Sequence, residues 1–393
     1  MPAFPTTRSF TGLNNVTDPL RLGLAALVQA DNINITETGA IEKRTGYSLA
    51  LLGAMTGAYA TVDQQRLYFV DAGSLKAMTG RTSAVTIKTG LTATQPMAWT
   101  EINRTVYFTN GVDSGFIEPD NSVGAWAWPV PAMPRLSAST GRLDAGLYRV
   151  CFTYTLPDGS MTGAGMADEL VLSEKSALQI QDIPQLPGCK TNVYIAPANS
   201  TVFQYAGSPT GATTGWNSAP DALGADLLAG LHSPLPQGIT CIAAWRSRIY
   251  AAQHFGSAGQ SVVWFSQPLG FHLFALDTDF FMVPGQITFL GATTEALIVG
   301  TDSRIYAYDG NTLVVLAEYG APAGQHTAPD GGRLLFWTHR GLCAALPFAN
   351  LTSARVSFAP GAKAGGALIE QDGQRRYVAC VQPNGQAAYN AHF

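Results

Sequence analysis

The hydrophobic positions of this chain follow a short unit that recurs along most of its length: an apolar stretch, a turn containing Gly, Asp or Asn, and a second apolar stretch. Short apolar runs bounded by such turns predict paired β-strands rather than helices. Six copies begin at Arg66, Thr105, Arg248, Ala296, Arg333 and Arg376. Neighbouring copies start roughly 40 residues apart, which is the length of a four-stranded propeller blade. We therefore expect an all-β fold, a β-propeller of about six blades.

One interval in this series, between the second and third copies, is longer than the others by roughly 100 residues. The stretch from Arg135 to Trp216 holds strand-like alternations separated by turn signals such as Pro157-Asp158-Gly159. This length and pattern predict an inserted immunoglobulin-like or fibronectin-like β-sandwich, entered through the proline-rich stretch WPVPAMPR. The expected organisation is an N-terminal segment with propeller-closing strands (1–55), the first part of the propeller (56–134), the inserted sandwich (135–217) and the second part of the propeller (218–393).

The stretch DNINITETGAIEKRTGY, residues 31–47, predicts a β-hairpin. Its strands would be Ile33 to Ile35 and Ala40 to Lys43, with Gly39 providing the permissive backbone of the turn. The last copy leaves too few residues for four strands. We therefore expect this hairpin to complete the last blade by pairing with residues 376–393.

Two short helices are expected beside the strands. Asp18 can cap a helix that has Pro19 in its first turn. At the exit from the sandwich, Leu223, Leu227 and Leu231 follow one another at helical spacing and predict a second helical stretch.

The chain contains few charged residues, and this affects the surface that we expect for it. Charged residues make up 13% of the chain, against about 25% in typical soluble proteins, so Ser, Thr, Asn, Gln and Gly must supply most of the polar surface. Such a surface suits a subunit of an assembly. The net charge is -4 and there is no Lys/Arg run, which argues against DNA binding through a basic patch. The N-terminus lacks signal-peptide character and the longest apolar run is far too short for a membrane span, so we expect a protein made in a cytoplasm.

Sugar-cleaving enzymes also use propellers, and they require paired carboxylates. The candidates are Asp277, Asp279, Asp302 and Asp330. Asp277 and Asp279 are two positions apart on a predicted strand and would face the same side, but a solvated strand end explains them better. Because no motif supplies a nucleophile, a base and an orienting partner together, we expect no enzymatic activity and no catalytic residues.

Other chemistry-bearing residues favour structural roles. The six histidines, His232, His254, His272, His326, His339 and His392, are scattered without a zinc motif, and His339 beside Arg340 suits a turn better than a base. The glycines of Met161–Glu169 suit a sandwich loop better than a phosphate cradle. Trp126 and Trp128 indicate packing at a domain junction. The cysteines, Cys151, Cys189, Cys241, Cys343 and Cys380, are expected as buried free thiols. No cofactor and no metal are expected.

Several stretches together resemble a family of tailed-bacteriophage virion proteins. The opening FTGLNNVTDPLRL, which leads to LVQADNINITETGAIEKRTGY, is similar to the start of phage tail propellers. The later stretches HSPLPQGITCIAAWRSRIYAA, VVWFSQP and ALIVGTDSRIYAYDG are similar to the second half of the same family. These motifs are structural, so they bring no active residues to this sequence.

The resemblance implies a tail hub, nozzle or tail-tip component in the virion, assembled in the host cytoplasm. Its partners would be other tail proteins and further copies of itself in a ring, with DNA only in transient passage through a channel. An alternative is a tail-tip module for host attachment that binds a surface receptor or glycan through loops of the sandwich. A third class, a propeller glycosidase, would need carboxylates that converge at the mouth of the central channel.

Overall fold

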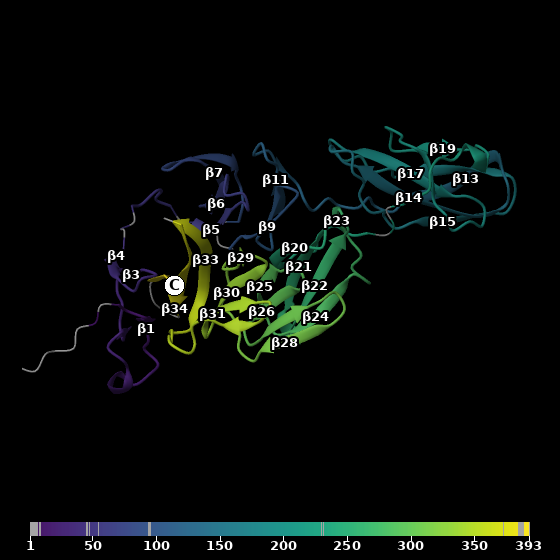
Figure 1. Cartoon of the computed structure of the whole chain (residues 1–393). Helices are drawn as coiled ribbons and strands as arrows, with labels where there is room; N and C mark the ends of the chain where they lie inside the picture. The colour runs from purple at the N-terminus through teal and green to yellow at the C-terminus, as the bar shows by residue number, and fades with distance from the viewer. Residues whose placement is uncertain are drawn as a thin grey trace, which may run out of the picture.

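The computed structural model describes residues 7, 9–44, 46, 48–53, 55–92, 96–228, 230, 232–371, 373–383 and 389–392. The protein is all-β, as the repeat pattern predicts. Its strands form many small sheets (Figure 1). The helices of the described residues are short 3-10 turns: η1 (Pro19–Arg21), η2 (Pro220–Ala222) and η3 (Gly256–Ala258).

Six antiparallel sheets, here called the first to the sixth sheet, account for most of the chain. The first contains β5 (Met55–Ala60), β6 (Leu67–Asp71), β7 (Ser74–Gly80) and β8 (Ser83–Lys88). The second contains β9 (Ala98–Ile102), β10 (Thr105–Thr109), β11 (Ser114–Ile117) and β12 (Val123–Gly124). The third contains β20 (Ile239–Trp245), β21 (Arg248–Phe255), β22 (Gln260–Gln267), β23 (Gly270–Phe274) and β24 (Phe280–Pro284).

The remaining three sheets follow in chain order. The fourth contains β25 (Ile287–Ala292), β26 (Leu297–Thr301), β27 (Ile305–Tyr308) and β28 (Leu313–Ala317). The fifth contains β29 (Ala328–Asp330), β30 (Arg333–Thr338), β31 (Gly341–Ala345) and β32 (Ala349–Asn350). The sixth contains β33 (Gly361–Gln371), β34 (Gln374–Pro383) and β35 (Tyr389–His392). Each predicted repeat copy begins at, next to or within the second strand of a different sheet.

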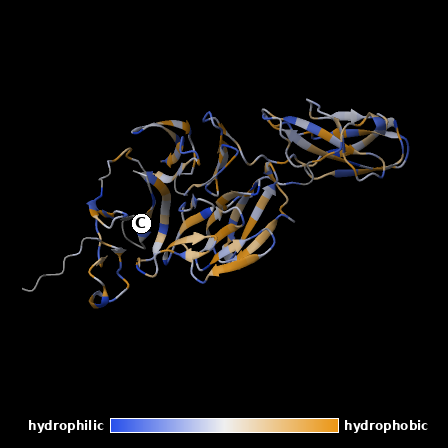
Figure 2. Ribbon diagram, in the orientation of Figure 1, coloured by the Kyte–Doolittle hydropathy of each residue, from blue (hydrophilic) through white to orange (hydrophobic). Residues whose placement is uncertain are grey.

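Consecutive sheets pack face to face and share cores (Figure 1). Strand β30 shows how alternation produces this arrangement, because successive side chains point to opposite faces. Leu334 and Phe336 belong to the core shared with the fourth sheet, whereas Leu335 and Trp337 belong to the core shared with the sixth. Figure 2 shows the hydrophobic strands concentrated in the third and fourth sheets. Within the described residues, no such core joins the sixth sheet to the first.

Residues 135–216 form a separate lobe of two sheets at the end of two linkers (Figure 1). One sheet contains β13 (Arg135–Leu143), β16 (Ser176–Gln181) and β19 (Thr214–Trp216). The other contains β14 (Gly146–Thr155), β15 (Asp168–Leu172), β17 (Lys190–Ala196) and β18 (Gln204–Gly207). Both sheets contribute to one core, which includes Phe152, Leu178 and Trp216. We call this lobe the sandwich.

The N-terminal residues form two small pairs of strands. Strands β1 (Gly12–Leu13) and β2 (Ala26–Leu27) pair in parallel, and β3 (Ile33–Ile35) and β4 (Ile41–Lys43) form the predicted hairpin. Gly39 has a φ of +83°, and a Cβ there would lie 2.8 Å from the Ser9 Cβ, so the turn requires glycine.

The predicted pairing of this hairpin with residues 376–393 is wrong for the described residues. The hairpin is a sheet of its own, and β34 pairs with β33 and β35. The turn instead lies against the preceding chain, because the Phe10 N–H donates to the Gly39 carbonyl (2.8 Å). A different tether reaches the C-terminal half: the Asn15 Nδ2 donates to the Ser357 carbonyl (3.1 Å), and the Ser357 N–H donates to the Asn15 Oδ1 (2.7 Å).

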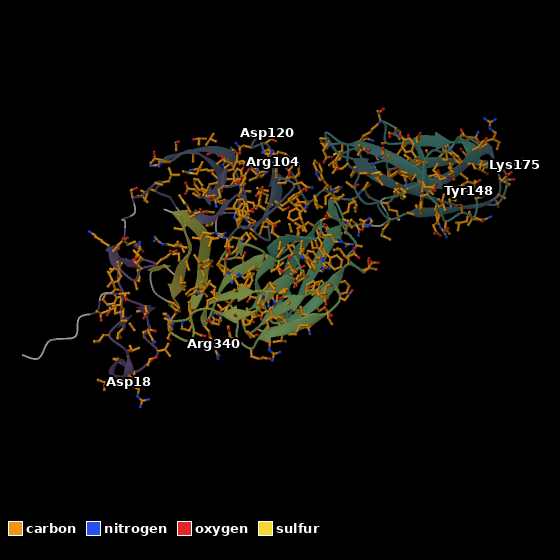
Figure 3. The ribbon with its side chains drawn as sticks, viewed as in Figure 1. Asp18, Arg104, Asp120, Tyr148, Lys175 and Arg340 are labelled. Atoms are coloured by element: carbon orange, nitrogen blue, oxygen red, sulfur yellow. The ribbon has the colours of Figure 1, made fainter. Side chains whose placement is uncertain are left out.

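Of the two expected helices, the first is present, whereas the prediction of the second is wrong. The Asp18 carboxylate caps η1 by accepting from the Leu20 N–H (3.0 Å), and Figure 3 labels Asp18 there. The predicted stretch over Leu223 and Leu227 is extended apart from η2, while Leu231 lies outside the described residues. The reason is pairing with the sandwich, since the Leu227 N–H donates to the Phe203 carbonyl (2.8 Å).

Candidate functional site

The carboxylates considered for sugar cleavage belong to three different sheets and lie in turns or at a strand end. Asp277 and Asp279 precede β24 in a turn, so their predicted place on a strand is wrong. The Asp279 carboxylate pairs with Arg248 (3.3 Å) and accepts from the Gln267 Nε2 (2.7 Å), which ties the third sheet together. Asp302 is exposed in the turn between β26 and β27.

Asp330 joins the fifth and sixth sheets. Its side chain is 18% exposed and accepts from Arg333 (3.0 Å) and Arg375 (2.7 Å). Both carboxylate oxygens therefore hold neighbouring elements together. This arrangement suits an ion pair in the fold rather than an acid or base acting on a substrate.

His326 is the histidine with the most constrained surroundings, and the sequence offered no signal that separated it from the others. Its side chain is fully buried, and the Trp337 N–H donates to Nδ1 (3.2 Å). Nε2 therefore carries the hydrogen and donates to the Pro322 carbonyl (2.8 Å). Burial lowers the pKa of His326 from 6.5 to about 4. The Tyr377 hydroxyl donates to the His326 carbonyl, so this residue links the fifth and sixth sheets as a neutral group.

The remaining titratable candidates are also structural in their surroundings. His339 lies in the turn between β30 and β31, as expected, and burial lowers its pKa. Cys151 and Cys343 are buried free thiols, and burial raises the pKa of Cys151 to about 12. Cys189 and Cys241 are only partly buried. The expectation of burial is wrong for Cys380, which is exposed on β34, because alternate residues of that strand face away from the fifth sheet. Among the described residues, no group of three or more His, Cys, Asp and Glu side chains could hold a metal.

The glycines of the Met161–Glu169 stretch pack against the two linkers of the sandwich. A Cβ on Gly163 would lie 1.8 Å from the His232 carbonyl oxygen, and one on Gly165 would lie 2.2 Å from that of Pro131. Only a residue without a side chain allows this approach, so the loop is a clasp around both linkers rather than a phosphate cradle.

Two further contacts join the third sheet to the first linker and to the glycine loop of the sandwich. The Trp126 Nε1 donates to the Phe271 carbonyl (2.7 Å), and the His272 Nε2 lies 3.0 Å from the Met161 carbonyl. Trp126 is buried in the core shared by the second and third sheets, so it packs between the two sheets that flank the insertion rather than against the sandwich. Trp128 is half-buried.

Two cavities are the remaining candidates for a binding site. One, of about 290 Å³, lies in the sandwich beside Ile180, Ile195 and Trp216. The other, of about 490 Å³, is bounded by turns of the third, fourth and fifth sheets and is lined by Ala244, Trp245, Arg246, Ala292, Thr293, Thr294, Pro329, Gly332 and Arg333. We call it the turn cavity. The sequence did not single it out, because its walls come from three separate sheets.

Comparisons with known proteins leave the family open. No family model and no curated protein matches this chain. Among solved structures, a functionally unknown protein from Desulfotomaculum acetoxidans DSM 771 is similar with 11% identity and a TM-score of 0.32, covering 83% of this chain and 93% of that one. Hsv2 from Kluyveromyces lactis is similar with 8% identity and a TM-score of 0.32, covering 87% and 98%. These scores are too low to carry an argument about function. In the described residues, no helix is long and apolar enough to cross a membrane.

Proposed function

We propose that this chain is a non-enzymatic structural component of a bacteriophage tail, in a hub, nozzle or tail-tip ring around the DNA path. In this proposal the six sheets are the blades of one propeller, and the sandwich is an inserted immunoglobulin-like domain. The resemblance of the N-terminal and second-half motifs to phage tail propellers supports it. The residues of the first motif also have structural roles here, since Asn15 tethers the N-terminal segment and Asp18 caps η1.

The observation that carries the proposal is the exposure of the N-terminal segment, which we define as residues 9–53. Gly39 is the only buried residue among its described positions. Large apolar side chains are nevertheless frequent in it, and those that are at least half exposed are Val16, Leu20, Leu24, Leu49 and Leu52. Covering one such side chain completely is worth about 1.5–3 kcal/mol. An ordered, hydrogen-bonded segment that buries almost nothing of its own is suited to packing on a neighbouring subunit.

The clasp at the sandwich supports a mechanical role. Gly163 and Gly165 lie against both linkers, and His272 of the third sheet contacts the Met161 carbonyl, so these contacts favour one direction of the sandwich relative to the third sheet. Fixed domains on a rigid set of sheets would keep neighbouring tail proteins in register during assembly and DNA ejection.

The proposal is tested by measuring the mass of the purified protein in solution for wild type and two variants. Replacing Leu20, Leu49 and Leu52 by Ser removes the most exposed apolar side chains of the N-terminal segment. Val171→Ser is the matched control, because Val171 is 70% exposed on the sandwich. We expect ring-sized assemblies for wild type and for the control, and smaller species for the triple variant. A wild-type protein that stays monomeric at the highest soluble concentration, with or without tail partners, would contradict the proposal.

The alternative function, attachment to a host receptor or glycan, is favoured by the cavity in the sandwich. That cavity combines the apolar walls of Ile180, Ile195 and Trp216 with the polar Ser208 and Thr214. Particles that carry a Thr214→Arg chain, in which a long charged side chain fills the cavity and the core Trp216 is kept, should assemble normally and adsorb poorly if this alternative holds. Normal adsorption of such particles would exclude it for this cavity.

A further inference from the structure

The turn cavity lies at the ends of three neighbouring hairpins. The turn between β20 and β21 brings Trp245 and Arg246, the turn between β25 and β26 brings Thr293 and Thr294, and the turn between β29 and β30 brings Arg333. At about 490 Å³ it falls within the range of roughly 300–1,000 Å³ that is typical of small-ligand sites.

Arg246 is held in place without an acidic partner. Its Nη1 donates to the Asp309 carbonyl (2.8 Å), and its Nη2 donates to the Glu295 carbonyl (3.3 Å). The guanidinium also lies 4.2 Å from the centroid of the Trp245 ring, which orients it by a cation–π contact. Its positive charge is not balanced by an ion pair with any described residue, so it remains available to an anion.

Arg333 adds a second cation to the same cavity. Among the described residues its carboxylate partner is Asp330, which also pairs with Arg375, so one acidic group serves two guanidinium groups. The side chains of Glu295 and Asp309 are exposed near these turns, but neither forms an ion pair with Arg246 or Arg333. Arg246 therefore keeps a positive charge that no described carboxylate pairs with, which favours an anionic ligand.

The walls also indicate what the rest of the ligand is like. Ala244, Ala292 and Pro329 give small apolar surfaces, and the exposed Thr294 adds a hydroxyl group. Trp245 is 5% exposed, and its indole N–H has no acceptor within the part of the chain that the structure describes. This N–H is itself buried, so the polar contacts to a ligand come from the Arg246 guanidinium and the Thr294 hydroxyl.

We propose that the turn cavity binds a sugar that carries a carboxylate group. A carboxylate can accept two parallel hydrogen bonds from one guanidinium group, and the sugar ring and hydroxyls fit the mixed apolar and polar walls. Inorganic phosphate has the charge but not the size, and a neutral sugar has the size but not the charge. This binding activity goes beyond the proposed role in assembly and does not depend on it, because the cavity lies outside both the N-terminal segment and the sandwich.

The experiment titrates the full-length protein with glucuronate, glucose and inorganic phosphate, followed by ligand-observed NMR. We expect glucuronate to bind, glucose and phosphate to bind at least roughly tenfold more weakly, and added salt to weaken glucuronate binding. Arg246→Gln should weaken glucuronate binding by about tenfold or more, and Arg246→Lys by less. Arg304→Gln is the matched control, since Arg304 pairs with Glu318 (2.7 Å) and does not line the cavity.

Several outcomes would overturn the proposal. Glucose or phosphate binding as tightly as glucuronate would refute a carboxylated sugar as the ligand class. An equal loss in Arg246→Gln and Arg304→Gln would show that the effect is general electrostatics. Because Arg246 also holds two carbonyls, the melting temperature of each variant is measured beside binding. If Arg246→Gln does not fold, Arg333→Gln takes its place with the same expected loss.

Discussion

Burial of His326 makes the stability of the fifth and sixth sheets depend on pH. In the folded protein the Trp337 N–H donates to Nδ1 of His326. A proton added to Nδ1 would make two N–H groups face each other without an acceptor between them. Burial accordingly lowers the pKa of His326 from 6.5 to about 4. Between these values the unfolded chain binds a proton that the folded protein does not, and stability is therefore lost as the pH falls from 6.5 toward 4.

The size of the effect follows from the same two pKa values. Each pH unit between them is worth about 1.4 kcal/mol, so the loss by pH 4 is roughly 3 kcal/mol. His326→Gln removes the titrating group and disturbs two buried hydrogen bonds, which costs about 1–3 kcal/mol at neutral pH. The difference in the free energy of unfolding between wild type and this variant should shrink, close or reverse as the pH is lowered.

The assay is urea unfolding followed by tryptophan fluorescence at a series of pH values from about 7 down to about 4. Tyr377→Phe is the control, because it removes the hydroxyl bonded to the His326 carbonyl without removing a group that titrates in this range. It should lower stability by a similar amount at every pH. If the free energy of unfolding differs between wild type and His326→Gln by the same amount at every pH, the account of His326 as a buried neutral histidine is refuted.

Three further predictions concern the junction, the N-terminal tether and the insertion. Gly163→Val should open the clasp at the His232 carbonyl and increase cleavage of the linkers in limited proteolysis, while the sandwich still melts cooperatively; unchanged cleavage would contradict the clasp. Asn15→Ala removes both side-chain bonds to Ser357, so the Ser357 amide should exchange hydrogen faster, by about tenfold for each 1.4 kcal/mol lost; unchanged exchange would show that the tether is not formed. Replacing residues 137–216 by a Gly/Ser linker should leave a soluble, cooperatively melting set of sheets, and an insoluble or molten product would refute the division.

Local pattern was sufficient to predict the sheets. The alternation in RLLFWT places Leu334 and Phe336 on one face of β30 and Leu335 and Trp337 on the other, and both faces are buried. The strand-turn-strand unit identified the second strand of each sheet. It missed β33, because GAKAGGALIEQ is rich in glycine and short side chains and lacks the apolar run of the other copies.

Features that depend on distant partners could not be predicted in the same way. Leu223 and Leu227 have helical spacing, but backbone groups of the sandwich pair with this segment and keep it extended. The hairpin at residues 33–43 was predicted correctly, whereas its partner was not, since pairing register carries no local signal. The turn cavity has no local sequence signal either, because Arg246 and Arg333 meet only after three sheets have packed together.

The proposed place of this chain in a phage tail is tested most directly by the composition and imaging of purified particles. Quantitative mass spectrometry of virions, combined with labelling of the chain in electron micrographs, gives its copy number and its place. We expect the protein in the tail in a copy number that is a multiple of three, as a ring requires. Its absence from particles that are fully infectious would contradict the account.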